Sequence, residues 1–98
     1  MPLYSHVIYM ITFPNGKIYI GKDVGAFGHS LRYFGSWRDD LIEADFSRAE
    51  LSDFTIRKTI LFESTDPREI SRVEPALIRD WRSNDPKVGY NRWPKFRG

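Results

Sequence analysis

The turn Pro14-Asn15-Gly16 constrains the fold of this 98-residue chain more than any other feature, because it separates two runs rich in β-branched and aromatic residues, 6–13 and 17–21. Such runs on either side of a short turn signal predict a β-hairpin. Proline suits the first central position of a type I turn, and the glycine can adopt the left-handed conformation that follows. We therefore expect two antiparallel strands here.

The length of the loop decides where two tyrosines of the hairpin point. A three-residue loop pairs Tyr9 with Gly21 and Ile11 with Tyr19, so both phenols lie on one face. A two-residue loop shifts the pairing by one residue and sends the phenols to opposite faces. They are then either ordinary strand-forming aromatics or, on a shared face, a pair of proton-handling groups.

Composition indicates one domain spanning 1–98, since 41% of the residues are apolar and 15% are aromatic, enough for a single core. The absence of cysteine excludes disulfides and thiolate metal sites and suits a reducing compartment. No apolar run approaches the roughly 20 residues of a membrane span, and the N-terminus does not resemble a signal peptide. We expect a cytoplasmic domain without membrane contact.

The segments after the hairpin predict an α+β domain. Residues 23–35 are rich in glycine and predict a loop. A helix-start pattern, Ser36 followed by Asp39, predicts a helix that reaches Phe46, and 53–62 reads as a third strand. The expected fold is an α/β sandwich-like arrangement, a small antiparallel sheet of about three strands with flanking helices.

The clearest helix signal begins at Asp66, which suits the N-cap, with Pro67 at the first helical position and Glu69 completing a capping box. Helical spacing of 100° per residue gathers one apolar stripe and leaves an arginine face opposite. The stripe consists of Ile70, Val73, Leu77, Ile78 and Trp81, and the opposite face of Arg68, Arg72, Arg79 and Arg82.

Glu74 falls at about 40° from Ile70, in the middle of the apolar stripe. A carboxylate facing a core costs several kcal/mol unless it is paired, hydrogen-bonded or bound to a metal. Pro75 follows directly and removes a helix hydrogen bond. Glu74 either pairs with a lysine or arginine that reaches over the hairpin, lies at the rim, or belongs to a functional site.

Charge is distributed unevenly along the chain. Net charge is +2 over 1–35, −3 over 36–64 and +3 over 65–98, where the segment from Asn84 onward is both basic and aromatic. A surface built from the two basic ends would attract a polyanion such as a nucleic acid. Within this segment, Asn91 is either a turn residue bonded to nearby backbone or a residue that positions a phosphate or a neighbouring side chain.

Together these elements resemble the GIY-YIG nucleases, in particular the phage-type and homing-endonuclease-type catalytic domains. Five short motifs occur in the family's order over residues 7–91. They are Val7-Ile8-Tyr9, Tyr19-Ile20-Gly21, the RYFGS segment at 32–36, Glu74 on its helix, and the DPKVGYN segment at 85–91. Val7 stands where the family name has glycine. The family's arginine falls on His29 by counting without gaps, and Arg32 is the better candidate because only a guanidinium offers a fixed charge and a planar fork.

The resemblance implies a DNA endonuclease with one divalent ion, Mg²⁺ or Mn²⁺, on Glu74. Arg32 would stabilise the phosphate, Tyr33 would assist proton movement or position the phosphate, and Asn91 would brace the site. Tyr9, or else Tyr19, would be the general base. Because an ordinary tyrosine has a pKa of about 10, the base needs a nearby cation, and Lys22 is the expected one. The residues expected to contact DNA are Lys17, Lys22, Arg32, Arg92 and Lys95.

Three alternatives remain open from the sequence. The domain could bind DNA without cutting it, it could be a small protein-interaction module, or it could cut RNA. We also expect no room for a recognition domain after residue 98, so the protein would cut with low specificity, or a homodimer or a partner protein would supply specificity. If a phage encodes the chain, its location is the cytoplasm of the host cell.

Overall fold

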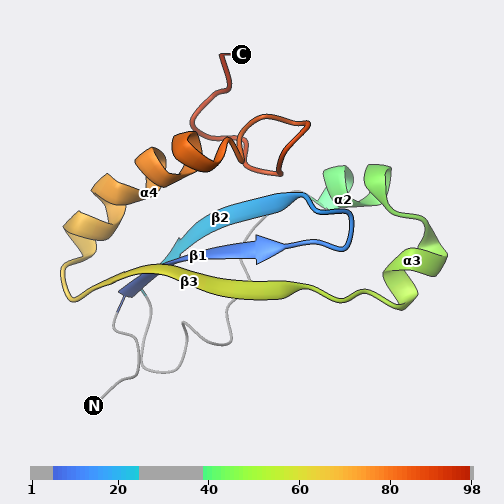
Figure 1. Ribbon diagram of the computed structural model, residues 1–98, viewed down its shortest axis with the longest axis horizontal. Helices are drawn as coiled ribbons and strands as arrows, with labels where there is room; N and C mark the ends of the chain where they lie inside the picture. Colours follow the sequence, from blue (N-terminus) through green and yellow to red (C-terminus); the bar gives the residue numbers. More distant parts are fainter. Residues whose placement is uncertain (1–5, 25–38, 98) are drawn as a thin grey trace.

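The fold is a three-stranded antiparallel sheet with helices at one end and along one face (Figure 1). The computed structural model describes residues 6–24 and 39–97. Strands β1 (His6–Thr12), β2 (Ile18–Asp23) and β3 (Arg57–Ser64) take the order β2-β1-β3, so β2 is an edge strand. The predicted α+β class, with about three strands and flanking helices, is confirmed.

The hairpin contains the three-residue loop. The N–H of Phe13 donates to the carbonyl of Lys17 at 2.9 Å, and the N–H of Gly16 donates to the carbonyl of Phe13 at 2.9 Å. Gly16 has a φ of 87°, the left-handed conformation that the turn requires. Tyr9 consequently pairs with Gly21, and Ile11 with Tyr19, so the two phenols share a face.

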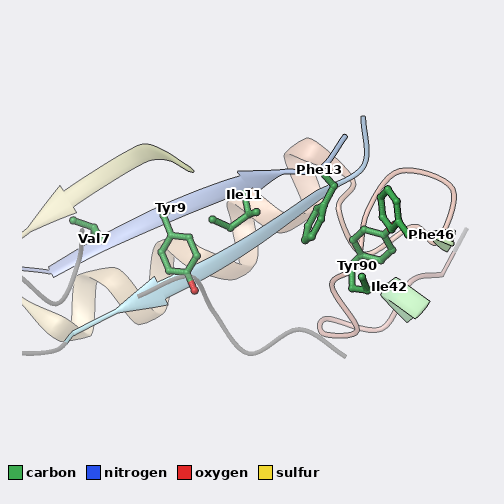
Figure 2. Close-up of a cluster of buried hydrophobic side chains, with 7 residues drawn as sticks. All are labelled: Val7, Tyr9, Ile11, Phe13, Ile42, Phe46 and Tyr90. Carbon is green, nitrogen blue, oxygen red and sulfur yellow. The ribbon is translucent and has the colours of Figure 1, made fainter. Parts of the chain in front are cut away.

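The sheet buries a different apolar cluster on each face. One cluster continues along β1 and meets side chains beyond the turn end of the hairpin (Figure 2); it consists of Val7, Tyr9, Ile11, Phe13, Ile42, Phe46 and Tyr90. The other face is covered by α4 (Pro67–Trp81), whose Ile70 and Ile78 pack against Ile8 and Ile20. The predicted stripe residues Val73 and Leu77 also pack there.

Strand β3 begins four residues later than predicted, at Arg57 instead of residue 53. Phe54 and Ile56 do not pair in the sheet but pack against the cluster below β1. The ring of Phe54 lies 5.0 Å from that of Phe46 and 5.9 Å from that of Phe13, centroid to centroid. Aromatic packing with non-local residues therefore takes precedence over strand propensity in this segment.

The predicted helix 36–46 is seen as α2 (Asp39–Asp45), while Ser36 and Trp37 lie outside the described residues. A further short helix, α3 (Arg48–Ser52), was not predicted. It begins with a capping box in which Ser47 Oγ accepts from the N–H of Glu50 at 3.2 Å, and the N–H of Ser47 donates to Glu50 Oε1 at 2.8 Å. The sequence signal for it, a serine followed three residues later by a glutamate, is present.

Helix α4 starts where predicted, with Asp66 Oδ1 accepting from the N–H of Arg68 at 2.9 Å. Glu69 does not close a capping box with the N-cap; its carboxylate lies 3.5 Å from Arg72 instead. The helix continues through Pro75 and ends at Trp81. Trp81, predicted on the inner face, is 45% exposed because the cluster under α4 ends at Ile78.

Among the helices of the described residues, none combines the length and the apolar character that crossing a membrane requires.

Candidate active site around the hairpin and helix α4

The two tyrosines of the hairpin form a close pair. Their ring centroids are 6.5 Å apart and the rings are tilted by 45°. Tyr9 is buried and Tyr19 is half-buried. The phenol of Tyr9 lies across Gly21, where a Cβ would fall 2.5 Å from the Tyr9 hydroxyl oxygen and 3.0 Å from Cε2 of Tyr19. The glycine of the Tyr19-Ile20-Gly21 motif thus leaves the space that the phenol pair occupies.

The lysine beside the phenol pair is Lys58 and not Lys22. Lys58 faces Ile11 across β1 and β3, and its Nζ lies 4.6 Å from the centroid of the Tyr9 ring. Burial lowers the pKa of Lys58, and the nearby charge of Asp23 opposes this shift. The expectation that Lys22 adjoins one of the tyrosines is wrong, because strand alternation turns Lys22 to the other face.

Lys22 lies on the face covered by α4, where its Nζ donates to Ser71 Oγ at 2.9 Å. Ser71 precedes Pro75 by four residues, so its carbonyl is the helix acceptor that the proline leaves without an N–H donor. Lys22 therefore meets α4 at the turn that the proline interrupts.

Glu74 is half-buried on the same helix. Burial raises the pKa of its carboxyl, and the charge of Lys22 opposes this effect. Within residues 6–24 and 39–97, no ion pair or hydrogen bond is formed by the Glu74 carboxylate. Its oxygens are also absent from the set of buried, unpartnered polar atoms in that part of the chain, so solvent reaches them.

The sheet separates the tyrosines from Glu74. The tyrosines face the cluster below β1, and α4 covers the opposite face. Both faces meet only at the two edges of the sheet, formed by β2 and β3, and α4 contacts β2 more extensively than β3. The described residues contain no group of three histidine, aspartate or glutamate side chains arranged to hold a metal ion. One carboxylate completed by water and substrate is still a normal magnesium arrangement.

Asn91 closes part of the β2 edge with its side chain. Its Oδ1 accepts from the N–H of Ile20 and its Nδ2 donates to the carbonyl of Ile20, both at 2.7 Å. The backbone next to it continues the pairing: Ile18 donates to the carbonyl of Val88 at 3.1 Å and accepts from the N–H of Tyr90 at 2.8 Å. Asn91 is thus a brace of the tyrosine-bearing strand and not merely a turn residue.

Lys17 has a partner within the protein. Its Nζ lies 2.8 Å from Asp45 Oδ2, and that same oxygen accepts from the Tyr90 hydroxyl at 2.6 Å. Asn15 Nδ2 donates to the Tyr90 hydroxyl at 2.9 Å. Burial, followed by the hydrogen bond to Asp45, raises the pKa of Tyr90 to about 12. Hydrogen bonds from Lys17 and Tyr90 lower the pKa of Asp45. The charge of Lys17 is therefore largely satisfied without DNA.

Arg92 and Lys95, predicted to contact DNA, are both exposed on the segment after Asn91. Lys95 lines a groove of about 640 Å³ beside the C-terminal end of α4, here called the C-terminal groove. Sequence reasoning did not single out Arg79, Arg82, Trp93 and Arg97, which line it too. The signal for Trp93 and Arg97 was the alternation of cations and aromatic rings in the RWPKFR segment at 92–97, whereas Arg79 and Arg82 belong to the arginine face of α4.

Three residues of the predicted site, His29, Arg32 and Tyr33, lie outside the described residues.

Comparison of the chain with protein-family models, with curated proteins and with solved structures finds no match.

Proposed function

We propose that this chain is a metal-dependent DNA endonuclease of the GIY-YIG type. The observation that carries the proposal is the close pairing of Tyr9 and Tyr19 over Gly21. The Val7-Ile8-Tyr9 and Tyr19-Ile20-Gly21 motifs are separate in the sequence. They meet here because the register of the hairpin places both phenols on one face. Such a pair of phenols on one face can transfer a proton, and the half-buried Glu74 provides a carboxylate for a cation.

Hydrolysis of a phosphodiester needs an activated water, stabilisation of charge on the phosphate and a proton for the leaving 3′ oxygen. In the proposed site the phenol of Tyr9, or that of Tyr19, accepts the proton of the water. Lys58 takes the part first expected of Lys22, because a cation beside the Tyr9 ring favours the deprotonated phenol. Asn91 is a positioning residue that fixes β2, and with it Tyr19, through Ile20.

The chemistry of Glu74 suits Mg²⁺ or Mn²⁺, which bind carboxylate oxygens and retain several waters. Glu74 would hold the ion, and the ion when bound supplies Lewis-acid stabilisation of the phosphate. Arg32 remains the proposed phosphate-stabilising residue and Tyr33 the proposed proton relay. Because the sheet separates Glu74 from the phenols, we infer that the phosphate is held at the edge of β2, where groups from both faces can reach it.

The separation of Glu74 from the phenols also favours a second candidate, a domain of this fold that binds DNA without cutting it. The two are distinguished by incubating supercoiled plasmid with the protein in Mg²⁺ and in EDTA. We expect nicking in Mg²⁺ only. Glu74→Gln, Tyr9→Phe and Tyr19→Phe should lower the rate, with a loss of about 10²- to 10⁴-fold for the tyrosine that acts as base.

The control variant is Glu69→Gln, a carboxylate on the same helix that pairs with Arg72 at the surface. It should nick at the wild-type rate. Salt-sensitive DNA binding without nicking would establish the binding-only domain. Nicking that survives Glu74→Gln would remove the metal site from this helix, and the absence of both binding and nicking would favour a protein-interaction module.

A further inference from the structure

The C-terminal groove presents several cations to solvent. Arg79 and Arg82 come from the end of α4, and Lys95 and Arg97 from the segment that follows, and all four are exposed. Arg82 lies 3.4 Å from Asp85, whose side chain is 11% exposed. In the described part of the chain no ion pair joins Arg79, Lys95 or Arg97 to an acidic side chain, and no acidic residue lines the groove. The groove therefore offers uncompensated positive charge.

An aromatic ring stands at this cationic groove. Trp93 is 71% exposed, the most exposed of the large apolar side chains described, and Phe96 lines the groove with it. Exposed tryptophan beside exposed arginine and lysine is the combination that binds single-stranded nucleic acid, in which bases stack on rings and cations follow the phosphates. A continuous duplex offers no base face to Trp93, because its bases are stacked on one another.

The backbone that carries Trp93 is held in place. Asn91, two residues earlier, is fixed to Ile20, and Pro94, the next residue, accepts a hydrogen bond from Asn84 Nδ2 at 2.7 Å. Pro94 is buried. A ring on such a segment loses little freedom when a base stacks on it, which favours affinity.

The groove also extends toward Asn91, whose side chain bonds Ile20 at the edge of β2. A second hollow of about 550 Å³ shares Asn84, Lys95 and Phe96 with it and extends to Asn91 and Arg92. A single strand of nucleic acid with a base on Trp93 could therefore pass along Arg92 toward β2, which carries Tyr19.

We propose that the C-terminal groove binds an unpaired stretch of DNA, with a base stacked on Trp93 and phosphates on Arg79, Lys95 and Arg97. This inference deepens the proposed nuclease function and rests on it for the identity of the substrate, which becomes DNA with a single-stranded region beside the cut. Binding itself needs neither the metal nor the tyrosines.

The test is fluorescence anisotropy of a labelled oligothymidylate and of a duplex of the same length, in EDTA so that no cleavage takes place. We expect the wild-type protein to bind the single strand more tightly. Trp93→Ala should weaken this binding about 5- to 150-fold, the loss of one stacked base, and Trp93→Phe should restore most of it. Since Trp93 is exposed, both variants should unfold at the wild-type temperature.

The role of the cations is tested with two double variants, one in the groove and one away from it. Arg79→Ala with Arg97→Ala should lower the slope of log affinity against log salt by about 0.7 for each lost phosphate contact. Arg68→Ala with Arg72→Ala removes the same charge from the opposite end of α4 and should leave the slope unchanged. Preference for the duplex, or equal loss in both double variants, would overturn the proposal. Plasmid nicking is scored separately, so a failed nuclease and a failed groove give different results.

Discussion

The phenol of Tyr9 lies directly over Gly21, its partner in the neighbouring strand. The two halves of the hairpin motif are thus linked by steric fit, independently of any catalytic role. A side chain at 21 would have to displace either the Tyr9 hydroxyl or the ring of Tyr19. The glycine is thus required by the tyrosines, whatever the tyrosines do.

Gly21→Ala should destabilise the fold by about 1 to 3 kcal/mol, because the new methyl group overpacks a buried site. Urea unfolding measures this change. In a Tyr9→Phe background the same substitution should cost less, since the atom nearest to the new Cβ, the hydroxyl oxygen at 2.5 Å, is gone. Equal cost in both backgrounds would mean that the phenol does not fill this space.

Asn91→Ala should cost about 1 to 3 kcal/mol, because it leaves the N–H and the carbonyl of buried Ile20 without their partner. Asn91→Asp should cost at least as much at neutral pH, since a carboxylate cannot donate to the Ile20 carbonyl. Protonation should recover part of the loss at low pH. The neighbouring exposed Arg92→Ala should change stability by no more than about 0.5 kcal/mol.

Glu74→Gln should stabilise the protein at neutral pH. Burial raises the pKa of Glu74 above its ordinary value of 4.5, so the folded state disfavours the charged form. Stability linked to this group is fully present below the ordinary pKa and is lost as pH rises through the folded pKa. Urea unfolding should therefore show Glu74→Gln as the more stable form at pH 7, and the difference should shrink below the ordinary pKa. A less stable variant at pH 7 would indicate that Glu74 forms a structural ion pair.

Tyr90 should make the fold sensitive to alkali. Its pKa is raised to about 12 from an ordinary 10.0, so its contribution is intact below pH 10 and is lost as pH rises toward 12. The wild-type protein should lose up to about 2 to 3 kcal/mol over this range, by about 1.36 kcal/mol per pKa unit. Tyr90→Phe should lose less, because no phenol at 90 ionises. Parallel urea titrations of the wild type and Tyr90→Phe at several pH values measure this loss of stability. The other tyrosines are present in both proteins, so their contribution cancels in the comparison.

The hairpin and α4 could be predicted from the sequence because their signals are local. The Pro-Asn-Gly turn marks the hairpin, although the sequence left its loop length open between two and three residues; the three-residue loop of the structure sets which residues face each other. The start of α4 follows from Asp66 and Pro67, and its buried side from helical spacing. For most residues of these elements the local preference agrees with the final packing, Trp81 and Glu74 of α4 being exceptions.

The position of Lys22 was within reach of the sequence but was missed. Once Gly21 is paired with Tyr9, alternation alone turns the next residue to the other face. Lys58 could not be found in this way, because its place beside Tyr9 depends on how β3 pairs with β1 and on a shift of register between Ile8 and Tyr9. The late start of β3 has the same origin, a non-local cluster around Phe54.

The C-terminal groove could not be predicted from the sequence either. Arg79 and Arg82 belong to a helix face that is normally read as solvated charge. Only the path of the chain after α4, which returns along the helix end, places them with Trp93 and Arg97.

Asn91 and Tyr90 reach back across more than two thirds of the chain to bond Ile20 and Asn15. During synthesis the hairpin leaves the ribosome long before these residues are made. Until then, the backbone groups at the edge of β2 have no hydrogen-bonding partners. An open strand edge is a template for pairing with another chain. Translation that stalls before residue 91 should therefore release a product that aggregates, although its hairpin is complete.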